Sequence, residues 1–215
     1  MIVKNIILDL GGVILDVSYE NTAAAFKELG IKNFDEVYSQ KKQEHFFDNY
    51  EKGIISDDEF RNEIRKSFSA HISDEQIDEA WNSLILTIPK ERFNFLVGLK
   101  RKYRLFLLSN TNTIHITEFT KLFENDFGKN AFDNLFEKIY YSCFLKMRKP
   151  DAEIFNLVMN ENNLDYSQTI FIDDSIQHVE GARKAGLTSF HLDTKNSDLK
   201  KLLQEIFLKT LNFKL

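Results

Sequence analysis

The 215-residue sequence is poor in cysteine: Cys143 is its single thiol, so no disulfide can form within the chain. A chain without disulfides suits a reducing compartment, and we expect the protein to be cytoplasmic. Prolines number two and glycines eight, so each one that interrupts a periodic segment predicts a turn or a helix end. The sequence contains neither an internal repeat nor a low-complexity linker.

Basic patches and long apolar runs are also missing. The net charge of −5 and the absence of a basic stripe argue against binding to nucleic acid. Asp9 breaks the first apolar run, so we expect neither a secretory signal nor a contact with a membrane. With 43% hydrophobic and 28% charged residues, the chain is expected to form one large globular domain or one domain with an insertion. No pattern in the sequence indicates an oligomeric state.

Short apolar runs alternate with helical patterns along most of the chain. The runs predict buried β-strands at residues 6–8, 105–108, 139–141, 170–172 and 189–192. Their continuous apolar character suits a parallel sheet that is covered on both faces. Helical spacing occurs at residues 114–125, 151–163, 176–185 and, in a last amphipathic segment, 199–210. This alternation predicts an α/β fold with a Rossmann-like open parallel sheet, in which ligands bind beyond the carboxyl ends of the strands.

The segment between the first two strands shows helical patterns only. Capping boxes beginning at Ser56 and Ser73 mark two helix starts, and Gly30 is placed to end a helix over residues 19–29. The segment is far too long for a simple crossover between neighbouring strands. We therefore expect two domains, a core and an inserted α-helical bundle that forms a cap over the edge of the sheet. Their predicted bounds are 1–16 and 99–215 for the core and 17–98 for the cap.

Polar side chains stand where the predicted strands end: Asp9, then Ser109 and Asn110, then Asp173 and Asp174, with Lys149 in the loop after the third strand. If the strands are parallel neighbours, these side chains meet at one edge, where three carboxylates repel one another unless a cation lies among them. Hard oxygen ligands in a partly open cluster suit Mg²⁺ together with a substrate phosphate. Lys149 and Ser109 can then contact other phosphate oxygens, and Gly11 and Gly12 can direct backbone N–H groups at the anion.

Four separated stretches carry a family resemblance. In chain order, DLGGV, LLSNTN, RKPDAEIF and FIDDS resemble the four motifs of the haloacid dehalogenase superfamily of hydrolases. Four spaced motifs in the right order are a specific pattern, whereas one alone would be weak. LSNTN and MRKP, with YEKGIISDDEF in the insertion, are similar to the branch of small sugar-phosphate phosphatases that includes bacterial glucose-1-phosphatase. The resemblance implies a helical cap and a Mg²⁺-dependent phosphatase acting on a small phosphorylated metabolite.

The resemblance also implies roles for the motif residues. Asp9 would be the nucleophile that forms an aspartyl-phosphate, which water then cleaves. Ser109 would hold a phosphoryl oxygen, and Lys149 would steady the nucleophile and the transferring group. The expected Mg²⁺ ligands are Asp9, Asp173, Asp174 and the main-chain carbonyl of Gly11. The expected substrate contacts are Leu10, Gly11, Ser109, Asn110 and Lys149.

Gly11 stands two residues after Asp9, where most phosphatases of this superfamily carry a second Asp that protonates the leaving alcohol. A positioned general acid contributes about 10²–10⁴-fold to a rate, so its absence is expected to slow catalysis without abolishing it. We therefore expect substrates whose leaving group needs little protonation, such as a sugar 1-phosphate, and the resembling branch also has Gly here. Alternatively, His45 or Glu51 of the cap donates the proton.

Three alternatives to a phosphatase stay open. A phosphomutase is conceivable, but such enzymes usually depend on the acid that Gly11 replaces. A 2-haloacid dehalogenase uses the same Asp without a metal, although Asp173 and Asp174 demand a cation. A catalytically silent binding or regulatory protein on this scaffold would explain Gly11, but not the joint presence of Asp9 and Lys149.

Other residues are given structural interpretations. Lys146 stands where the resembling branch usually has Gly, so the resemblance does not predict the backbone conformation of the turn before Lys149. Cys143 is expected to be a buried thiol, because no basic partner or helix start lies near it. The remaining histidines show no ligand spacing and receive no role. The cap aromatics are expected to form the core of the bundle rather than substrate contacts, namely Phe46, Phe47, Tyr50 and Trp81.

Overall fold

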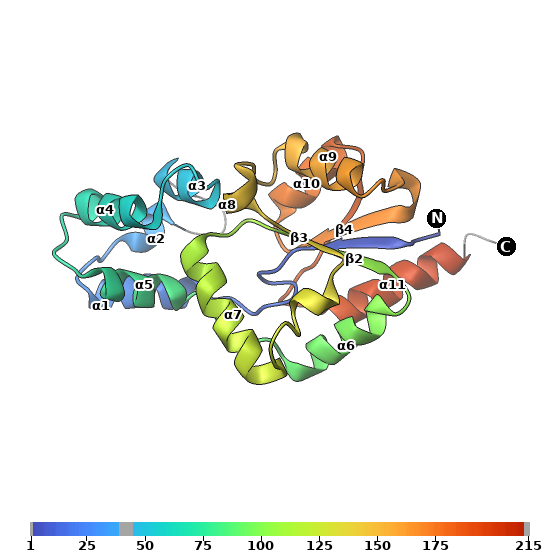
Figure 1. The fold of residues 1–215 in the computed structure, drawn as a ribbon, viewed down its shortest axis with the longest axis horizontal. Coiled ribbons are helices and arrows are strands. Elements are labelled where there is room, and N and C mark those ends of the chain that lie inside the picture. Colours follow the sequence, from blue (N-terminus) through green and yellow to red (C-terminus); the bar gives the residue numbers. More distant parts are fainter. Residues whose placement is uncertain (1, 39–44, 213–215) are drawn as a thin grey trace.

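The computed structural model describes residues 2–38 and 45–212 of the chain. Its centre is a five-stranded parallel sheet in the order β3-β2-β1-β4-β5 (Figure 1). The strands are β1 (Asn5–Leu8), β2 (Arg104–Ser109), β3 (Lys138–Tyr141), β4 (Thr169–Asp173) and β5 (Thr188–His191). Each predicted strand is present close to its expected bounds, and the prediction of a Rossmann-like α/β fold is confirmed.

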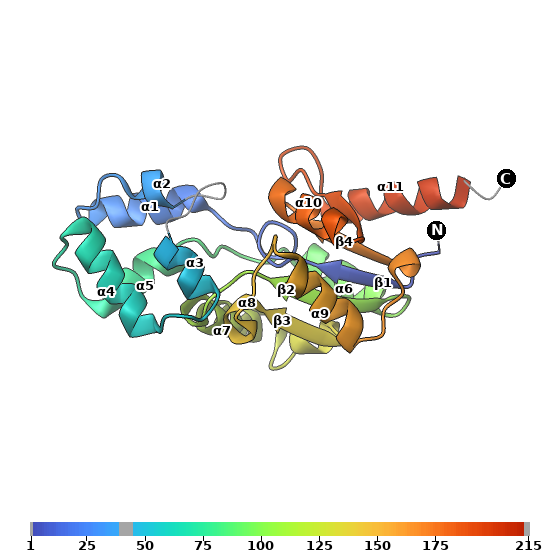
Figure 2. The same ribbon diagram turned by 90° about the horizontal axis from the view of Figure 1, so that it is seen from above.

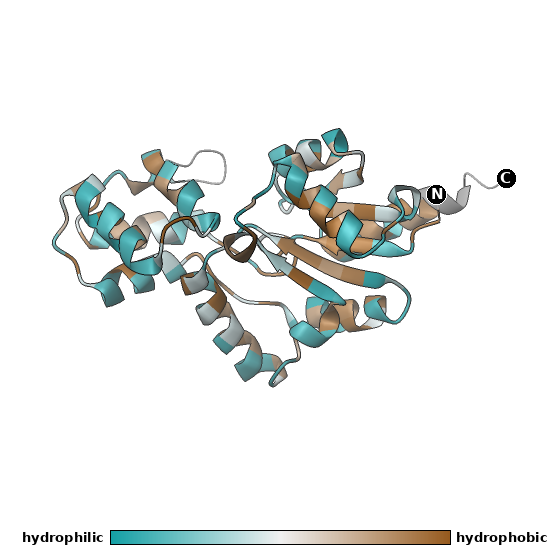
Figure 3. Ribbon diagram, turned by 45° about the horizontal axis from the view of Figure 1, so that its top comes forward, coloured by the Kyte–Doolittle hydropathy of each residue, from teal (hydrophilic) through white to brown (hydrophobic). Residues whose placement is uncertain are grey.

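Helices cover both faces of this sheet, because alternate strand residues point to opposite sides. Ile6 and Leu8 face one layer and Ile7 faces the other, and the strands are correspondingly hydrophobic in Figure 3. The first layer holds α6 (Lys90–Lys100), α7 (Thr113–Phe127), η1 (Asp133–Leu135) and α11 (Leu199–Asn212). The second holds α9 (Ala152–Glu161) and α10 (Ile176–Lys184). Among the described helices, none has the length and apolar character needed to cross a membrane.

The inserted helices form a separate body at the carboxyl edge of the sheet (Figures 1 and 2). They are α1 (Tyr19–Glu28), α2 (Phe34–Val37), α3 (His45–Glu51), α4 (Asp57–Phe68) and α5 (Asp74–Asn82), and we call them the cap. Both predicted capping boxes are present, because the Ser56 and Ser73 side chains accept from the N–H groups of Glu59 and Gln76. The cap has its own core, in which Phe47, Tyr50 and Trp81 are buried and Phe46 is half-buried, as predicted.

Helix α6 lies within the range expected for the insertion, yet it packs on the sheet. Its buried residues Leu96 and Leu99 belong to the same hydrophobic cluster as Ile6 and Leu8 of β1. The predicted boundary at residue 98 therefore falls inside a helix of the core layer, because helical spacing alone does not reveal which body a helix packs against. A division in which the cap ends after α5 stays a proposal.

Two short connections join the cap to the core. Val17 and Ile85 form an antiparallel bridge. Backbone hydrogen bonds link Asp16 with Leu86 and Thr87 on one side of it, and Ser18 with Leu84 on the other. A further contact fastens α3: the Ser142 hydroxyl, in α8 (Ser142–Leu145), donates to the Glu51 carbonyl oxygen at 2.6 Å. The connections and this contact together hold the cap over the ends of β1 and β2.

Candidate active site

A cavity of about 390 Å³ lies at the carboxyl edge of the sheet, beneath the cap. Parallel strands bring their last residues to this edge, so residues distant in sequence line one space. The predicted site residues that line it are Asp9, Leu10, Gly11, Ser109, Asn110 and Asp174. Lys149 and Asp173, also predicted, are fully buried and do not line the cavity. The predicted residues thus form two layers, one open to a ligand and one behind it.

Lys149 is the centre of the buried layer. Its Nζ lies 2.7 Å from Asp9 Oδ1, 2.7 Å from Asp173 Oδ2 and 2.9 Å from the Leu108 carbonyl oxygen. Burial opposes the charged amine, but the carboxylates of Asp173 and Asp9 raise the pKa of Lys149 above its usual value. Lys149 is therefore a fixed cation that holds one oxygen of Asp9.

The contacts of Asp173 differ from those expected of a Mg²⁺ ligand. Besides Lys149, its carboxylate accepts from the Ser175 N–H at 2.8 Å and contacts His178 Nδ1 at 3.0 Å. Burial alone would raise the pKa of Asp173, but Lys149 and His178 lower it well below its usual range. Asp9, Asp173 and His178 lie close enough to share a cation. However, the ammonium of Lys149 already lies between the two carboxylates, and a second cation there would be repelled. Asp173 is thus placed to position Lys149.

At the strand ends, the carboxylates that line the cavity are Asp9 and Asp174. Burial, followed by the charge of Asp173, raises the pKa of Asp9 to about 6. Burial, followed by the charge of Asp9, raises the pKa of Asp174 to about 8. Two neighbouring carboxylates with raised pKa values fit a divalent cation, since its charge would stabilise the ionised form of both. The residues present here therefore suit Mg²⁺ on the side of Asp9 that faces Asp174.

The two glycines after Asp9 play different structural parts. Gly12 has a φ of +72°, and a Cβ there would overlap the carboxylate of Asp174, so only glycine admits that side chain. The Gly12 N–H donates to the Leu15 carbonyl oxygen at 2.8 Å. Our expectation that it points at an anion was therefore wrong. At Gly11 a Cβ would meet only Val17, at 3.5 Å, which is ordinary van der Waals contact. The chain has room for a side chain where the general acid is missing.

The side chain of Asn110 is hydrogen-bonded to the loop that carries Lys149. Its amide donates to the Lys149 carbonyl oxygen and accepts from the Lys149 N–H, both at 2.9 Å. This pair of bonds fixes the backbone of Lys149, while Ser109, beside Asn110, lines the cavity. Lys146, three residues before the lysine, has a φ of +56° and follows α8. It therefore adopts the left-handed conformation for which glycine is usually required.

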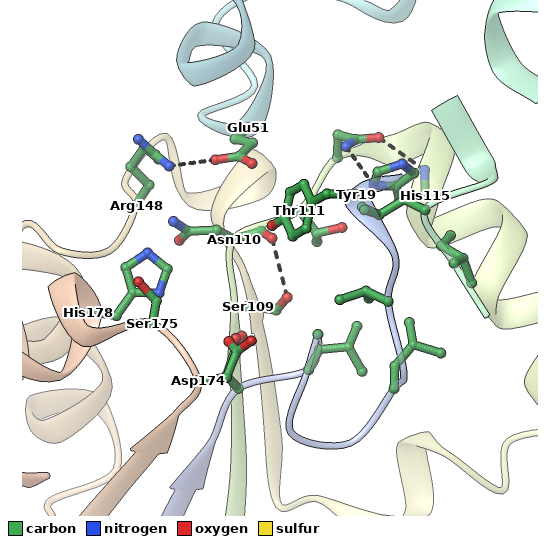
Figure 4. Close-up of a pocket in the computed structure, with 18 of the residues that line it drawn as sticks. Tyr19, Glu51, Ser109, Asn110, Thr111, His115, Arg148, Asp174, Ser175 and His178 are labelled. Atoms are coloured by element: carbon green, nitrogen blue, oxygen red, sulfur yellow. Dashed lines mark hydrogen bonds and ion pairs between the residues drawn. The ribbon is translucent and has the colours of Figure 1, made fainter. Parts of the chain in front are cut away.

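The cap side of the cavity carries residues that the sequence patterns did not single out as a group. A nitrogen of the Arg148 guanidinium lies 2.6 Å from Asp48 Oδ1, and another lies 2.8 Å from Glu51 Oε2; all three residues line the cavity. Figure 4 shows the Arg148–Glu51 ion pair. Tyr19 and Tyr38 line the same wall. The sequence pointed to this cluster only through the position of Arg148 next to the motif lysine, Lys149. The acidic partners of Arg148 belong to α3 of the cap, far away in the sequence. Of the two cap residues considered as proton donors, Glu51 lines the cavity, whereas His45 is exposed and does not.

Two other side chains have clear structural surroundings. Burial raises the pKa of the Cys143 thiol to about 11, which makes it an unreactive buried thiol, as expected. His115 stacks on Trp81 with ring centroids 4.8 Å apart, and its Nε2 contacts the Trp81 carbonyl oxygen at 3.1 Å. Burial lowers the pKa of His115 to about 4, so the ring is neutral at pH 7. This contact joins α5 of the cap to α7 of the core.

The protein has the features of a hydrolase of the α/β class: a parallel sheet with carboxylates at the strand ends and a cavity that lies beneath inserted helices. Residues 3–186 match the family model of the haloacid dehalogenase-like hydrolases, and the chain belongs to this family. The resemblance inferred from the four motifs is thereby confirmed.

Named relatives and a solved structure extend this match. The chain is 29% identical to D-ribitol-5-phosphate phosphatase of Bacteroides thetaiotaomicron, over 87% of this chain and 91% of the relative. A crystal structure of the HAD-family enzyme BT-2542 from the same organism, a mutant in complex with magnesium and inorganic phosphate, superposes with a TM-score of 0.85. It is 36% identical and covers 94% of this chain and 98% of its own. Sesquiterpene phosphatase astK of Aspergillus oryzae is 25% identical over 88% of this chain and 89% of the relative.

Proposed function

We propose that the protein is a Mg²⁺-dependent phosphatase that hydrolyses a small phosphorylated metabolite, through an aspartyl-phosphate on Asp9. One observation carries the proposal: Asp9 and Asp174 face one cavity while Lys149, fixed behind them, contacts Asp9 at 2.7 Å. The magnesium and phosphate in the BT-2542 structure and the phosphatase names of the two relatives support it. The volume of the cavity suits a small molecule rather than a polymer.

The chain supplies the groups for both chemical steps. A carboxylate oxygen of Asp9 forms a bond to phosphorus while the bond from phosphorus to the alcohol oxygen breaks and the alcohol leaves with the electron pair. Water then attacks phosphorus, and the Asp9 carboxylate is released together with inorganic phosphate. Lys149 orients Asp9 and, with the Ser109 hydroxyl, stabilises charge on the transferring group. When bound, Mg²⁺ would be held by Asp9, Asp174 and the Gly11 carbonyl and would neutralise phosphoryl oxygens.

Gly11 determines which leaving groups the site handles well. Because glycine cannot donate a proton, the departing alcohol oxygen must carry its charge or take a proton from water. A sugar 1-phosphate fits this demand, since its anomeric oxygen is more acidic than an ordinary alcohol. The Gly11 argument therefore favours a sugar 1-phosphate as the substrate. The D-ribitol-5-phosphate phosphatase relative supports the wider class of phosphorylated sugars and polyols, although its own leaving group is an ordinary primary alcohol.

Hydrolysis of p-nitrophenyl phosphate tests the proposal directly. We expect turnover with Mg²⁺, loss of turnover with EDTA, and a fall in kcat of more than about 10³-fold in Asp9→Asn, which lacks the nucleophile. Asp35→Asn, an exposed substitution in α2, should leave the rate unchanged. Turnover of a 2-haloacid without metal would instead indicate a dehalogenase. The absence of turnover across a broad panel of phosphate esters would indicate a binding protein.

A further inference from the structure

The Glu51–Arg148 ion pair belongs to the wall of the cavity that faces away from the sheet. Glu51 comes from α3 of the cap and Arg148 from the core loop beside Lys149, and their side chains are 10% and 17% exposed. Figure 4 shows them pointing towards each other, with Ser109 and Asp174 lying deeper, towards the strand ends. Asp48, one helical turn before Glu51, contacts the same guanidinium at 2.6 Å. A charged cluster therefore stands opposite the catalytic carboxylates across one cavity.

The position of this cluster determines which part of a substrate it would meet. A phosphoryl group beside Asp9 and Asp174 must direct its alcohol portion away from the strand ends, and the space in that direction is bounded by the cap. Glu51 and Arg148 thus lie where the leaving alcohol extends, whereas Ser109 lies at the phosphoryl end. Contacts at the cap end distinguish one phosphate ester from another, since the phosphoryl group is common to all.

We propose that Glu51 and Arg148 are specificity-determining residues that bind hydroxyl groups of the leaving alcohol and so select a polyhydroxylated substrate. This inference rests on the proposed phosphatase function. A carboxylate accepts hydrogen bonds from hydroxyls and a guanidinium donates to them, so the pair can bind both ends of a vicinal diol. Tyr19, also on this wall, adds a hydroxyl that stays protonated, because burial raises the pKa of its phenol well above its usual value.

The same cluster disfavours an apolar leaving group. A hydrocarbon chain placed against Glu51 and Arg148 would remove water from two charges and return no hydrogen bond. Sites built to bind hydroxyls reject analogues without them by about 10⁴–10⁵-fold in favourable cases. Part of the remaining lining is apolar and suits the carbon skeleton of a sugar or polyol, namely Leu15, Val17, Leu84, Ile85 and Phe119. The chain therefore differs in expected preference from a phosphatase that acts on sesquiterpenes.

D-ribitol 5-phosphate and n-pentyl phosphate form a matched pair for the test, because both are primary alkyl esters of five carbons and only one carries hydroxyls. We measure each as a competitor of p-nitrophenyl phosphate hydrolysis and compare their inhibition constants. The wild-type protein should prefer the ribitol ester by about 100-fold or more. Glu51→Gln and Arg148→Met should each reduce this preference at least tenfold, by weakening the ribitol ester only. For a variant that does not turn over, calorimetry with Mg²⁺ present gives the same comparison.

Lys52→Met is the control variant. Lys52 forms an ion pair with Asp151 at 3.5 Å between cap and core, outside the cavity, so its loss should leave the preference unchanged. Equal weakening of both esters in Glu51→Gln would assign the pair a purely structural role and overturn the inference, as would a wild-type preference for the pentyl ester. Absence of any phosphatase activity in the wild-type protein would overturn the proposed function itself, a result distinct from these.

Discussion

At the scale of single residues, the two glycines after the nucleophile serve opposite needs. Gly12 is required by its neighbour, because the carboxylate of Asp174 occupies the space of a Cβ at this position. Gly11 is not required sterically, since a Cβ there would make one ordinary contact, with Val17. The absence of an acid at Gly11 is therefore a matter of chemistry and not of space.

Gly11→Asp should restore a general acid. A Cβ at this position makes only ordinary contact with Val17, and residue 11 lines the cavity. A positioned acid contributes about 10²–10⁴-fold to a rate. We expect the rate on an alkyl phosphate to rise at least tenfold relative to the rate on p-nitrophenyl phosphate, measured as kcat/KM. Gly11→Asn, which has the same shape without the acid, is the control and should not change this ratio. An equal ratio in Gly11→Asp and the wild-type protein would show that another group already donates the proton.

Asp174 should make stability depend on pH and on Mg²⁺. Its pKa is about 8 in the folded chain and 3.8 in the unfolded chain, so the folded state binds more protons between these values. The metal-free protein should therefore lose stability as pH rises from about 4 to about 8. Asp9, with a pKa raised to about 6, acts in the same direction, and the lowered pKa of Asp173 matters only below about pH 4.

Thermal unfolding with and without Mg²⁺ measures this effect. We expect Mg²⁺ to raise Tm more at pH 8 than at pH 5, because the cation compensates the charges that high pH creates. In Asp174→Asn the metal-free Tm should vary less with pH, and the shift caused by Mg²⁺ should shrink. A shift of the same size at both pH values would contradict this assignment.

At the scale of elements, the turn between α3 and α4 brings the backbone of the cap into close contact with the backbone of the core. Gly53 has a φ of +62°, and a Cβ there would overlap the backbone carbonyl of Cys143. The same turn follows Glu51, whose carbonyl accepts from Ser142. Close backbone approach here fixes α3, and α3 carries the acidic partners of Arg148 into the cavity.

Gly53→Ala and Gly30→Ala separate backbone strain from this contact. Both glycines have positive φ, so alanine costs about 1–2 kcal/mol at either position. At Gly53 the clash with the Cys143 carbonyl should add about 1–3 kcal/mol, whereas nothing lies within 4 Å of a Cβ at Gly30. Urea unfolding followed by the fluorescence of Trp81, the single tryptophan, reports the stability of the cap that contains it. Equal losses in the free energy of unfolding of the two variants would refute a close contact between Gly53 and the Cys143 carbonyl.

At the scale of the whole molecule, the site is assembled from two bodies with separate cores. The core supplies Asp9, Asp174 and Lys149, and the cap supplies Asp48 and Glu51. Arg148, in the core, forms an ion pair with Glu51 of the cap. It directly precedes Lys149, whose backbone forms two hydrogen bonds with the Asn110 side chain. In the function that we propose, the core would carry out the phosphoryl chemistry and the cap would contribute to recognition of the alcohol.

Local chemistry made a large part of this architecture predictable. Strands of a parallel sheet that is covered on both faces have continuous apolar sequences. The capping boxes at Ser56 and Ser73 satisfy backbone groups within one helical turn. Both features can be recognised without knowledge of distant residues. The arrangement of polar residues at strand ends follows from parallel order alone, which is why Asp9, Ser109 and Asp174 were expected to meet. Their catalytic roles stay predictions.

The sequence by itself therefore determined the fold class, the presence of helices between β1 and β2, and the edge of the sheet at which Asp9, Ser109 and Asp174 meet. Only the tertiary structure decided that Asp173 holds Lys149, that α6 covers the sheet, and that Arg148 pairs with residues of the cap. Each of these depends on contacts between segments far apart in the chain. Periodicity and capping report the preferences of neighbouring residues, whereas the partner of a buried charge is chosen by whichever distant group the fold brings within hydrogen-bonding distance.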